Sequence, residues 1–203
     1  MKRWGAILLV LVLGVIFYYS LSSGTNEEDY KALVQKERQD KYDFLKTSEE
    51  SPFKDELDSF QGLKYYEPDS RYRIRASLSP IQDKKVVTLV TSTGEQTRYL
   101  EYAWATFTLD DVENKLLLLE VMDMGPQRGK IFLGFADATS ATETYGGGRY
   151  LEAKKIPAAT SIELDFNKAY NPFCAYVDRY SCPLPPRENI LHVAIRAGEK
   201  LYK

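Results

Sequence analysis

The run Tyr-Gly-Gly-Gly-Arg at residues 145–149 has residue types suited to holding an anion. Glycine has no side chain, so its backbone can approach a ligand closely, and successive N–H groups can form a nest around negative charge. Arg149 could add two parallel hydrogen bonds to a carboxylate or a phosphate. The run is not a phosphate-binding P-loop, because the Gly-Lys-Ser/Thr ending is missing. Two interpretations stay open: an anion site, or a structural turn in which Arg149 pairs with Asp165 or Glu188.

A second group of polar residues surrounds a long loop near the C-terminus. Two short stretches that alternate apolar and polar side chains, as half-buried strands do, flank residues 167–189. Loops of this length are usually functional or disordered, and the tyrosines of this one make it too apolar for disorder. Asp165 or Glu188, acting with His192, could perform general acid–base catalysis beside the loop. The alternative is a network of hydrogen bonds and ion pairs that holds the loop in place.

No nucleophile motif accompanies these residues. The sequence lacks the G-x-S-x-G of serine hydrolases and the H-E-x-x-H of zinc proteases. The favoured function is therefore a non-catalytic module that binds a small anionic or sugar-like ligand, or a partner. The alternative is a hydrolase that uses Asp165 or Glu188 with His192. We expect no cofactor and no bound metal. The predicted ligand-binding residues are Tyr145, Gly146, Gly147, Gly148, Arg149, Asp165, Asn167, Tyr170, Asn171, Glu188 and Asn189.

Cys174 and Cys182 are the only cysteines of the sequence, and both lie in the long loop. In an exported protein such a pair predicts a disulfide, which would stabilise the fold by about 2–3 kcal/mol in the chain-entropy model. Two buried reduced thiols are the first alternative. A metal site is the second, although Cys-x7-Cys is not a usual zinc spacing.

The N-terminal residues 1–22 predict a membrane or export segment. Lys2 and Arg3 precede an uncharged apolar run over residues 4–21, which is about 27 Å long as a helix. As a signal-anchor the run spans the membrane with its N-terminus inside, and as a signal peptide it is cleaved near Ser20-Leu21-Ser22. Both alternatives place the rest of the chain outside the cytoplasm. We expect a periplasmic domain anchored in the cytoplasmic membrane by this single helix.

The remaining chain divides into a helix and a β-rich domain. Thr25-x-x-Glu28 is a capping box, so a spacer helix, or else a partner-binding helix, is expected over residues 25–47. Residues 48–203 form one domain, in which short alternating stretches separated by turns predict about eight antiparallel strands in a sandwich or barrel. The formal net charge of −2 has no basic bias, so nucleic acid is not expected as a partner.

Several motifs resemble those of a bacterial, extracytoplasmic family known as domain of unknown function 1684. They include DFN-x-AYNP-x-CAY at residues 165–176, YSCPLPP-x-EN at residues 180–189, AGEK at residues 197–200 and a block from Phe135 to Leu151. The resemblance covers about residues 35 to 200. Because the family carries no established activity, the resemblance implies where a site lies and not what chemistry it performs.

Overall fold

The computed structural model describes residues 27–55, 57 and 60–203. Residues 27–47 are helical, so the helix expected over residues 25–47 is present in its described part. Lys31 pairs with Glu27 one turn away at 3.2 Å, a spacing that supports an exposed helix. The expected signal or anchor segment over residues 1–22 lies outside the described residues. Within the described part of the chain, no helix is both long enough and apolar enough to span a membrane.

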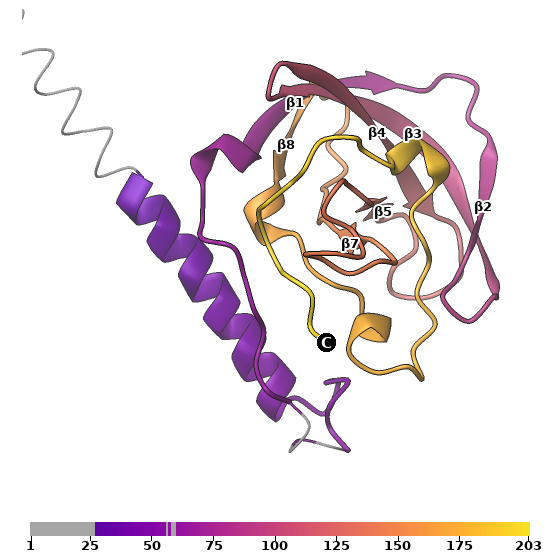
Figure 1. Ribbon diagram of the computed structural model, residues 1–203. Helices are drawn as coiled ribbons and strands as arrows, with labels where there is room; N and C mark the ends of the chain where they lie inside the picture. The colour runs from indigo at the N-terminus through magenta and orange to yellow at the C-terminus, as the bar shows by residue number, and fades with distance from the viewer. Residues whose placement is uncertain (1–26, 56, 58–59) are drawn as a thin grey trace, which may run out of the picture. The chain divides into compact units, whose positions relative to one another are not determined.

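After the helix the chain is mainly β, and every strand is paired antiparallel (Figure 1). The structure has β1 (Arg73–Pro80), β2 (Val86–Val90), β3 (Gln96–Leu109), β4 (Val112–Val121), β5 (Ile131–Phe132), β6 (Gly134–Phe135), β7 (Arg149–Tyr150) and β8 (Ser161–Asp165). Short 3-10 turns lie between them, namely η2 (Ser70–Tyr72), η3 (Phe166–Lys168), η4 (Phe173–Ala175) and η5 (Arg187–Asn189). The prediction of a mainly antiparallel β-domain is confirmed.

Six of the strands form one curved sheet, in which five follow the order β5-β4-β3-β1-β8 and the sixth, β2, pairs with β3. Strand β3 is long enough to pair with β2 through its first half and with β1 through its second half on the same side. Strands β6 and β7 form a separate two-stranded sheet. Figure 1 shows the large sheet, with β5 as its inner edge, curling around β7 and the loops of the C-terminal half. The two ends of the sheet, β5 and β8, do not pair, so the expectation of a closed barrel is wrong.

Strand β4 carries the centre of the core. Its residues Leu116, Leu117, Leu118 and Leu119 are all buried, although a strand with one wet face would alternate. Leu116 and Leu118 belong to the main cluster, whereas Leu117 and Leu119 belong to a second cluster on the other face. The continuous apolar run in the sequence therefore corresponds to a strand covered on both faces.

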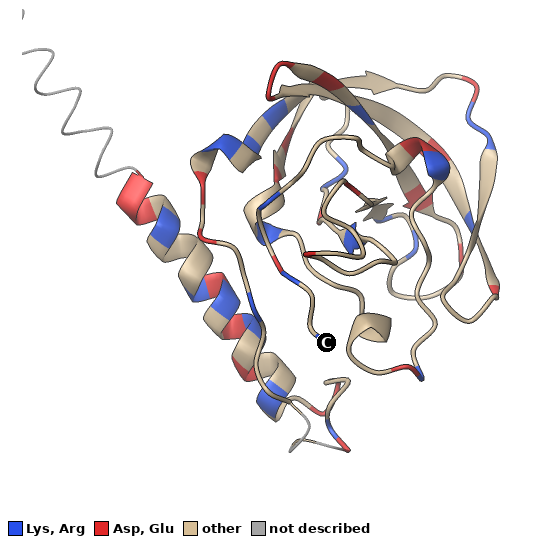
Figure 2. Cartoon of the chain, viewed as in Figure 1, with Lys and Arg blue, Asp and Glu red and all other residues tan. Residues whose placement is uncertain are grey.

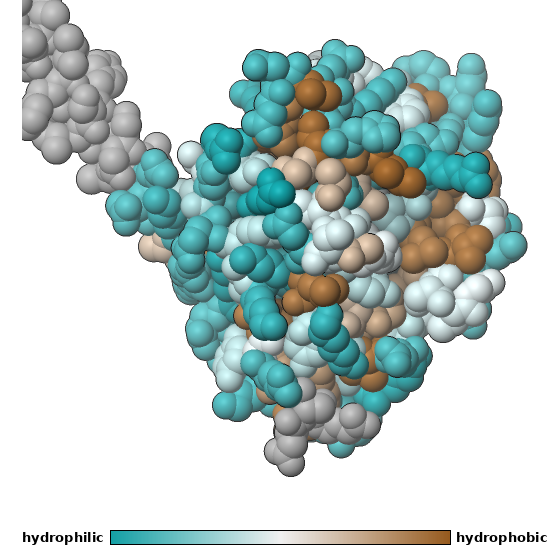
Figure 3. Space-filling view, in the orientation of Figure 1, coloured by the Kyte–Doolittle hydropathy of each residue, from teal (hydrophilic) through white to brown (hydrophobic). Residues whose placement is uncertain are grey.

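The surface mixes charges of both signs. Figure 2 shows acidic and basic residues interspersed along the helix and, separately, over the β-domain. On the face drawn in Figure 3, apolar side chains form separate patches among hydrophilic ones. Large exposed apolar residues such as Met124, Val86 and Ile190 come from different segments. Single exposed apolar side chains of this kind are normal and need no partner to explain them.

Candidate functional site

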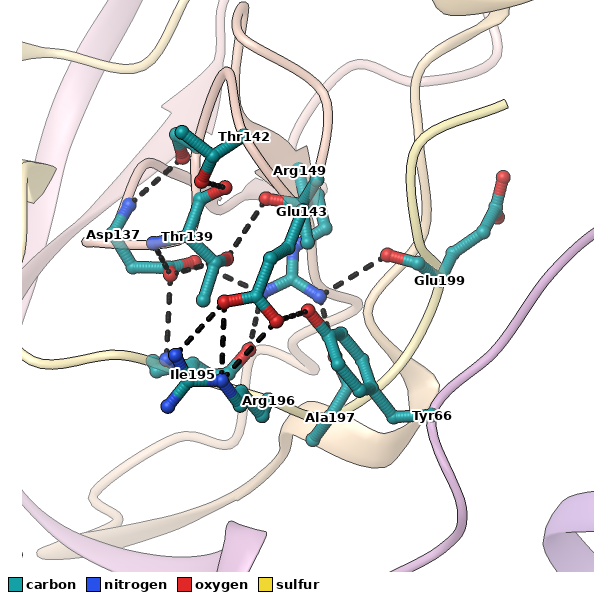
Figure 4. A network of polar contacts seen from close by, with 12 residues as sticks. Tyr66, Asp137, Thr139, Thr142, Glu143, Arg149, Ile195, Arg196, Ala197 and Glu199 are labelled. Atoms are coloured by element: carbon teal, nitrogen blue, oxygen red, sulfur yellow. Dashed lines mark hydrogen bonds and ion pairs between the residues drawn. The ribbon is translucent and has the colours of Figure 1, made fainter. Parts of the chain in front are cut away.

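Arg149 begins β7 and points its guanidinium into the protein, where only 1% of the side chain is exposed (Figure 4). Nη2 forms an ion pair with Oδ2 of Asp137 at 2.9 Å and donates to the carbonyl oxygen of Ile195 at 2.8 Å. Nη1 donates to the carbonyl oxygens of Ala197 and Glu199. Both terminal nitrogens of the guanidinium are thus occupied by the protein's own groups, whereas the buried Nε has no hydrogen-bond partner among the described residues. The structural partner expected at Asp165 or Glu188 is Asp137 instead.

Asp137 is equally well satisfied. Its Oδ1 accepts hydrogen bonds from the backbone N–H of Thr139 at 2.8 Å, from the hydroxyl of Thr139 at 2.6 Å and from the N–H of Ile195 at 3.3 Å. A buried ion pair is tolerated only when hydrogen bonds compensate both charges for the lost water. Asp137 and Arg149 meet that condition together.

The last segment of the chain is held by Arg149 in addition to isolated backbone hydrogen bonds to its neighbours. Alternation at Leu191, Val193 and Ile195 predicts a strand, and all three side chains are buried, but the segment pairs only through isolated bridges, from Ile190 to Ala136 and from Glu199 to Tyr65. In extended backbone, alternate carbonyl groups point the same way. The carbonyls of residues 195, 197 and 199 accept from Arg149, which takes the place of a neighbouring strand.

The C-terminal segment also contains a second buried acid, Glu199. Glu199 is 1% exposed, and its carboxylate accepts from Nδ2 of Asn171 at 2.8 Å and from the hydroxyl of Tyr176 at 2.5 Å. Burial and the charge of Glu199 raise the pKa of Tyr176 well above its ordinary value. Sequence reasoning overlooked Asp137 and Glu199 as key residues, although both lie in motifs of the family resemblance.

A second, exposed ion pair is formed by Glu143 and Arg196. Nε of Arg196 donates to both carboxylate oxygens of Glu143 at 3.1 Å, and Nη2 donates to Oε1 at 2.8 Å (Figure 4). The hydroxyl of Tyr66 donates to the same carboxylate at 3.0 Å. The Arg196 hydrogen bonds lower the pKa of Glu143. Burial, followed by the contact with Glu143, raises the pKa of Tyr66 to about 12. This outer pair is a natural comparison for the inner one.

Two asparagines among the predicted polar residues form hydrogen bonds with the backbone of other segments. Oδ1 of Asn189 accepts from the N–H of Leu117 at 2.6 Å, and its Nδ2 donates to the carbonyls of Leu117 and Gly134. Asn167 exchanges two hydrogen bonds with the backbone of Asp69. Each asparagine therefore fastens one segment to another that is distant in the sequence.

The acids and the histidine proposed for catalysis lie in different surroundings. Asp165 is buried at the end of β8, where Oδ1 accepts from the N–H and the Nδ2 of Asn167. Glu188 and His192 are both exposed, Glu188 in η5 and His192 beyond it. No described hydrogen bond or ion pair links Glu188 to His192.

The three glycines differ from one another. Gly148 is buried with a φ of +84°, and a Cβ placed there would lie 2.7 Å from the carbonyl oxygen of Phe135 and 2.5 Å from Cγ of Pro185. Gly146 is exposed, and its nearest contact would be Cβ of Ala141 at 3.3 Å. Among the three, only Gly148 combines a positive φ with contact to the loop over residues 167–189, which we call the proline-rich loop. Glycine is therefore required at position 148 by its backbone conformation and by its close packing.

A cleft of about 860 Å³ opens beside the glycine turn, between β5, residues 150–155 and the proline-rich loop. Its aromatic residues form a chain of ring contacts from Tyr99 to Phe132 at 5.0 Å, on to Tyr150 at 4.9 Å and to Tyr170 at 5.9 Å. The hydroxyl of Tyr150 donates to the carbonyl of Pro183 at 2.6 Å, which fixes that ring. We call this the aromatic cleft. Its charged lining residues are Lys130, Glu152, Lys154 and Lys155.

The predicted ligand-binding residues overlap with this cleft at one position. Among the residues that the structure describes, Tyr170 is the member of the predicted set that lines it. Burial, followed by the charge of Glu152, raises the pKa of Tyr170 to about 12. Tyr150 and Pro183 line the cleft next to the predicted turn and within the predicted loop. The two stretches selected from the sequence thus border the cleft, while most of its lining comes from elsewhere.

Comparison with known proteins places the chain in a family. A family model described as a protein of unknown function, DUF1684, matches residues 58–200. The chain belongs to the DUF1684 family. A solution NMR structure of an uncharacterised protein from gene locus rrnAC0354 of Haloarcula marismortui is 37% identical in sequence, with a TM-score of 0.65. That match covers 87% of this chain and 96% of the other. None of the curated proteins matches.

In this DUF1684 protein the two loop cysteines are free thiols, so the expected disulfide is absent. Both side chains are buried, and the backbone N–H of Cys174 donates to Sγ of Cys182 at 3.2 Å. The hydroxyl of Tyr145 lies 3.7 Å from Sγ of Cys174. Interaction with the Cys182 side chain lowers the pKa of Cys174 to about 6, and the same interaction raises the pKa of Cys182.

The thiol pair should lose its first proton near pH 6, below the ordinary thiol range. The Cys182 thiol donates to the Cys174 thiolate and so stabilises it, whereas the negative charge then opposes the second ionisation. Thiolate ultraviolet absorbance of the native reduced protein, followed against pH, measures both steps. The variant Cys174→Ser should lack the low step. A single step in the ordinary thiol range for the unmodified protein would contradict the prediction.

Proposed function

We propose that this DUF1684 domain is a non-catalytic module that binds a small anionic or sugar-like ligand in the aromatic cleft. The observation that carries the proposal is the composition of the cleft: a row of aromatic rings with lysines at its rim. Its volume of about 860 Å³ lies within the range of about 300–1,000 Å³ that is usual for small-molecule sites. Rings offer flat apolar surface to a ligand at little cost in conformational entropy, because they have few rotatable bonds.

Rigidity of the cleft wall supports binding over catalysis. Phe132 and Tyr150 meet edge to face, and Tyr150 is tied to Pro183 by its hydroxyl, so the wall is formed before a ligand arrives. The backbones of Tyr150 and Tyr170 exchange hydrogen bonds at 2.8 and 3.0 Å. The hydrolase alternative gains no comparable support, since Asp165 caps a buried turn while Glu188 and His192 are exposed.

A ligand panel on the full-length protein in mild detergent tests the proposal. The panel consists of neutral sugars, sugar acids, sugar phosphates and aliphatic and aromatic carboxylates, and binding is detected as a rise in melting temperature. A ligand at about 100 times its Kd adds about 2.7 kcal/mol of stability and should be readily seen. If none of these classes raises the melting temperature, the proposal fails.

A paired substitution then locates the binding site. Tyr170→Ala should weaken binding of the best panel ligand by about tenfold, the equivalent of about 1.4 kcal/mol, because it removes part of the cleft wall. Tyr102→Ala is the matched control, since Tyr102 is a half-buried tyrosine that does not line the cleft. Calorimetric titration of both variants gives the comparison. Equal weakening by both substitutions would place the ligand elsewhere.

A further inference from the structure

The lining of the aromatic cleft includes two lysines, Lys130 and Lys154, that stand next to the two partners of an isolated bridge. Ile131 of β5 forms an antiparallel bridge with Ala153. In antiparallel pairing, a step of one residue outwards on each strand reaches the next opposed pair, and such a pair shares one face. The bridge therefore places Lys130 opposite Lys154, and Phe132 opposite Glu152. All four residues line the cleft.

The charges of this lysine pair are not balanced by the protein. Like charges directly opposite on neighbouring strands destabilise the pairing. Lys155, the third lysine of the rim, forms an ion pair with Glu120 at 2.8 Å. Lys130 and Lys154 have no acidic partner among the residues that the structure describes. An anionic group bound between the two ammonium groups would replace repulsion by attraction, because the lysine ammonium is a compact positive charge that binds anions.

The neighbouring pair, Phe132 and Glu152, favours different chemical groups of a ligand. Phe132 and Tyr150 present ring surface, which favours the C–H groups of a ring. Glu152 stands opposite Phe132, and an ionised carboxylate only accepts hydrogen bonds. It therefore suits hydroxyl groups and repels a second negative charge. A ligand that satisfies all three parts of the cleft has an acid group at one end, a ring in the middle and hydroxyl groups at the other end.

We infer that the ligand class of the aromatic cleft is an acidic sugar. Its acid group lies between Lys130 and Lys154, its ring packs on Phe132 and Tyr150, and its hydroxyls donate to Glu152. A neutral sugar would leave the lysine pair uncompensated, an aliphatic acid would leave Glu152 without donors, and a polyanion would meet Glu152. This inference rests on the proposed function, because it specifies the ligand of the same cleft.

Two matched disaccharides test the acid group. Cellobiouronic acid and cellobiose differ in one carboxylate, so the ratio of their Kd values measures what the acid contributes. Calorimetric titration of the full-length protein in mild detergent at low salt should give about tenfold tighter binding of the acid, and the ratio should shrink as salt screens the lysines. Glucose 6-phosphate beside glucose provides the same comparison for a phosphate and distinguishes uronate from sugar phosphate as the source of the acid.

Substitutions that replace lysine with neutral glutamine test whether the preference for the acid depends on the lysine pair. Lys130→Gln combined with Lys154→Gln should reduce the preference for cellobiouronic acid over cellobiose to about twofold or less. Lys155→Gln removes the same charge from the same rim but from a lysine already paired with Glu120, so it should keep the preference. Equal loss of preference in both variants would overturn the role of the opposed pair.

The outcomes separate this inference from the proposed function. Equal affinity for cellobiouronic acid and cellobiose overturns the acidic-sugar inference and leaves a binding module for sugars. Equal affinity for cellobiouronic acid and hexanoate overturns the sugar part and leaves an anion-binding module. Binding of neither the sugars nor the acids overturns both. A preference for the acid sugar that disappears only with Lys130 and Lys154 supports the inference.

Discussion

Replacing Arg149 with methionine should lower the free energy of unfolding by about 3–5 kcal/mol. The substitution leaves Asp137 as a buried charge without its counter-ion, and it leaves the carbonyls of residues 195, 197 and 199 without their donor. Arg149→Lys should also be strongly destabilising, because an ammonium cannot reproduce the planar fork that reaches all four acceptors. Urea denaturation followed by circular dichroism measures both variants.

Arg196→Met is the matched control for this prediction. It removes the same residue type from an ion pair with an acid, Glu143, but in this pair the side chains are 58% and 39% exposed. Water compensates exposed charges for the loss of a partner, so the stability of this variant should change far less. Similar losses for Arg149→Met and Arg196→Met would contradict a special role of the buried pair.

Gly148→Ala should lower the free energy of unfolding by about 3 kcal/mol. A left-handed backbone conformation costs a residue with a Cβ about 1–2 kcal/mol. Overpacking adds about 1–3 kcal/mol, because the new methyl group would meet the carbonyl oxygen of Phe135 and the ring of Pro185. The carbonyl is backbone of a paired strand and cannot move without shifting β6.

Gly146→Ala tests the same chemistry two residues earlier. Gly146 is exposed and its φ lies outside the left-handed region, and a Cβ there would have the methyl group of Ala141 as its nearest contact, at 3.3 Å. Restricting the unfolded chain by replacing glycine offsets small native-state losses, so stability should stay within about 1 kcal/mol. A chemical denaturation series on both alanine variants compares them directly. Equal destabilisation would mean that the turn as a whole, and not Gly148, requires glycine.

Local patterns were enough to predict the elements. The capping box and acidic start predict the helix that is seen over residues 27–47, and alternation at Ile162 and Leu164 predicts β8. The continuous apolar run over residues 116–119 indicates a strand covered on both faces, as β4 is. These predictions succeeded because side-chain period and turn residues act over a few positions. The export segment at residues 1–22 remains a prediction from its apolar run.

Contacts between distant segments were beyond the sequence. Asp137, and not Asp165 or Glu188, pairs with Arg149 because β6 and β7 lie side by side with Phe135 opposite Arg149. The segment after Ile190 has the alternation of a strand, yet its carbonyls go to a guanidinium, which no periodicity can signal. The two cysteines are free thiols, with the backbone N–H of Cys174 donating to Sγ of Cys182, so spacing alone could not tell this state from a disulfide.

The sequence by itself determined the antiparallel β class and the helix before it, whereas the ligand-binding role of the stretches at residues 145–149 and 167–189 stays a prediction. Only the tertiary structure revealed the aromatic cleft. The aromatic cleft joins Phe132, Tyr150 and Tyr170 from three separate segments, and its lysine pair exists because residue 131 bridges to residue 153. The physical reason is that strand pairing over a long sequence distance depends on the sum of many weak burial and hydrogen-bond terms. No single stretch contains that sum.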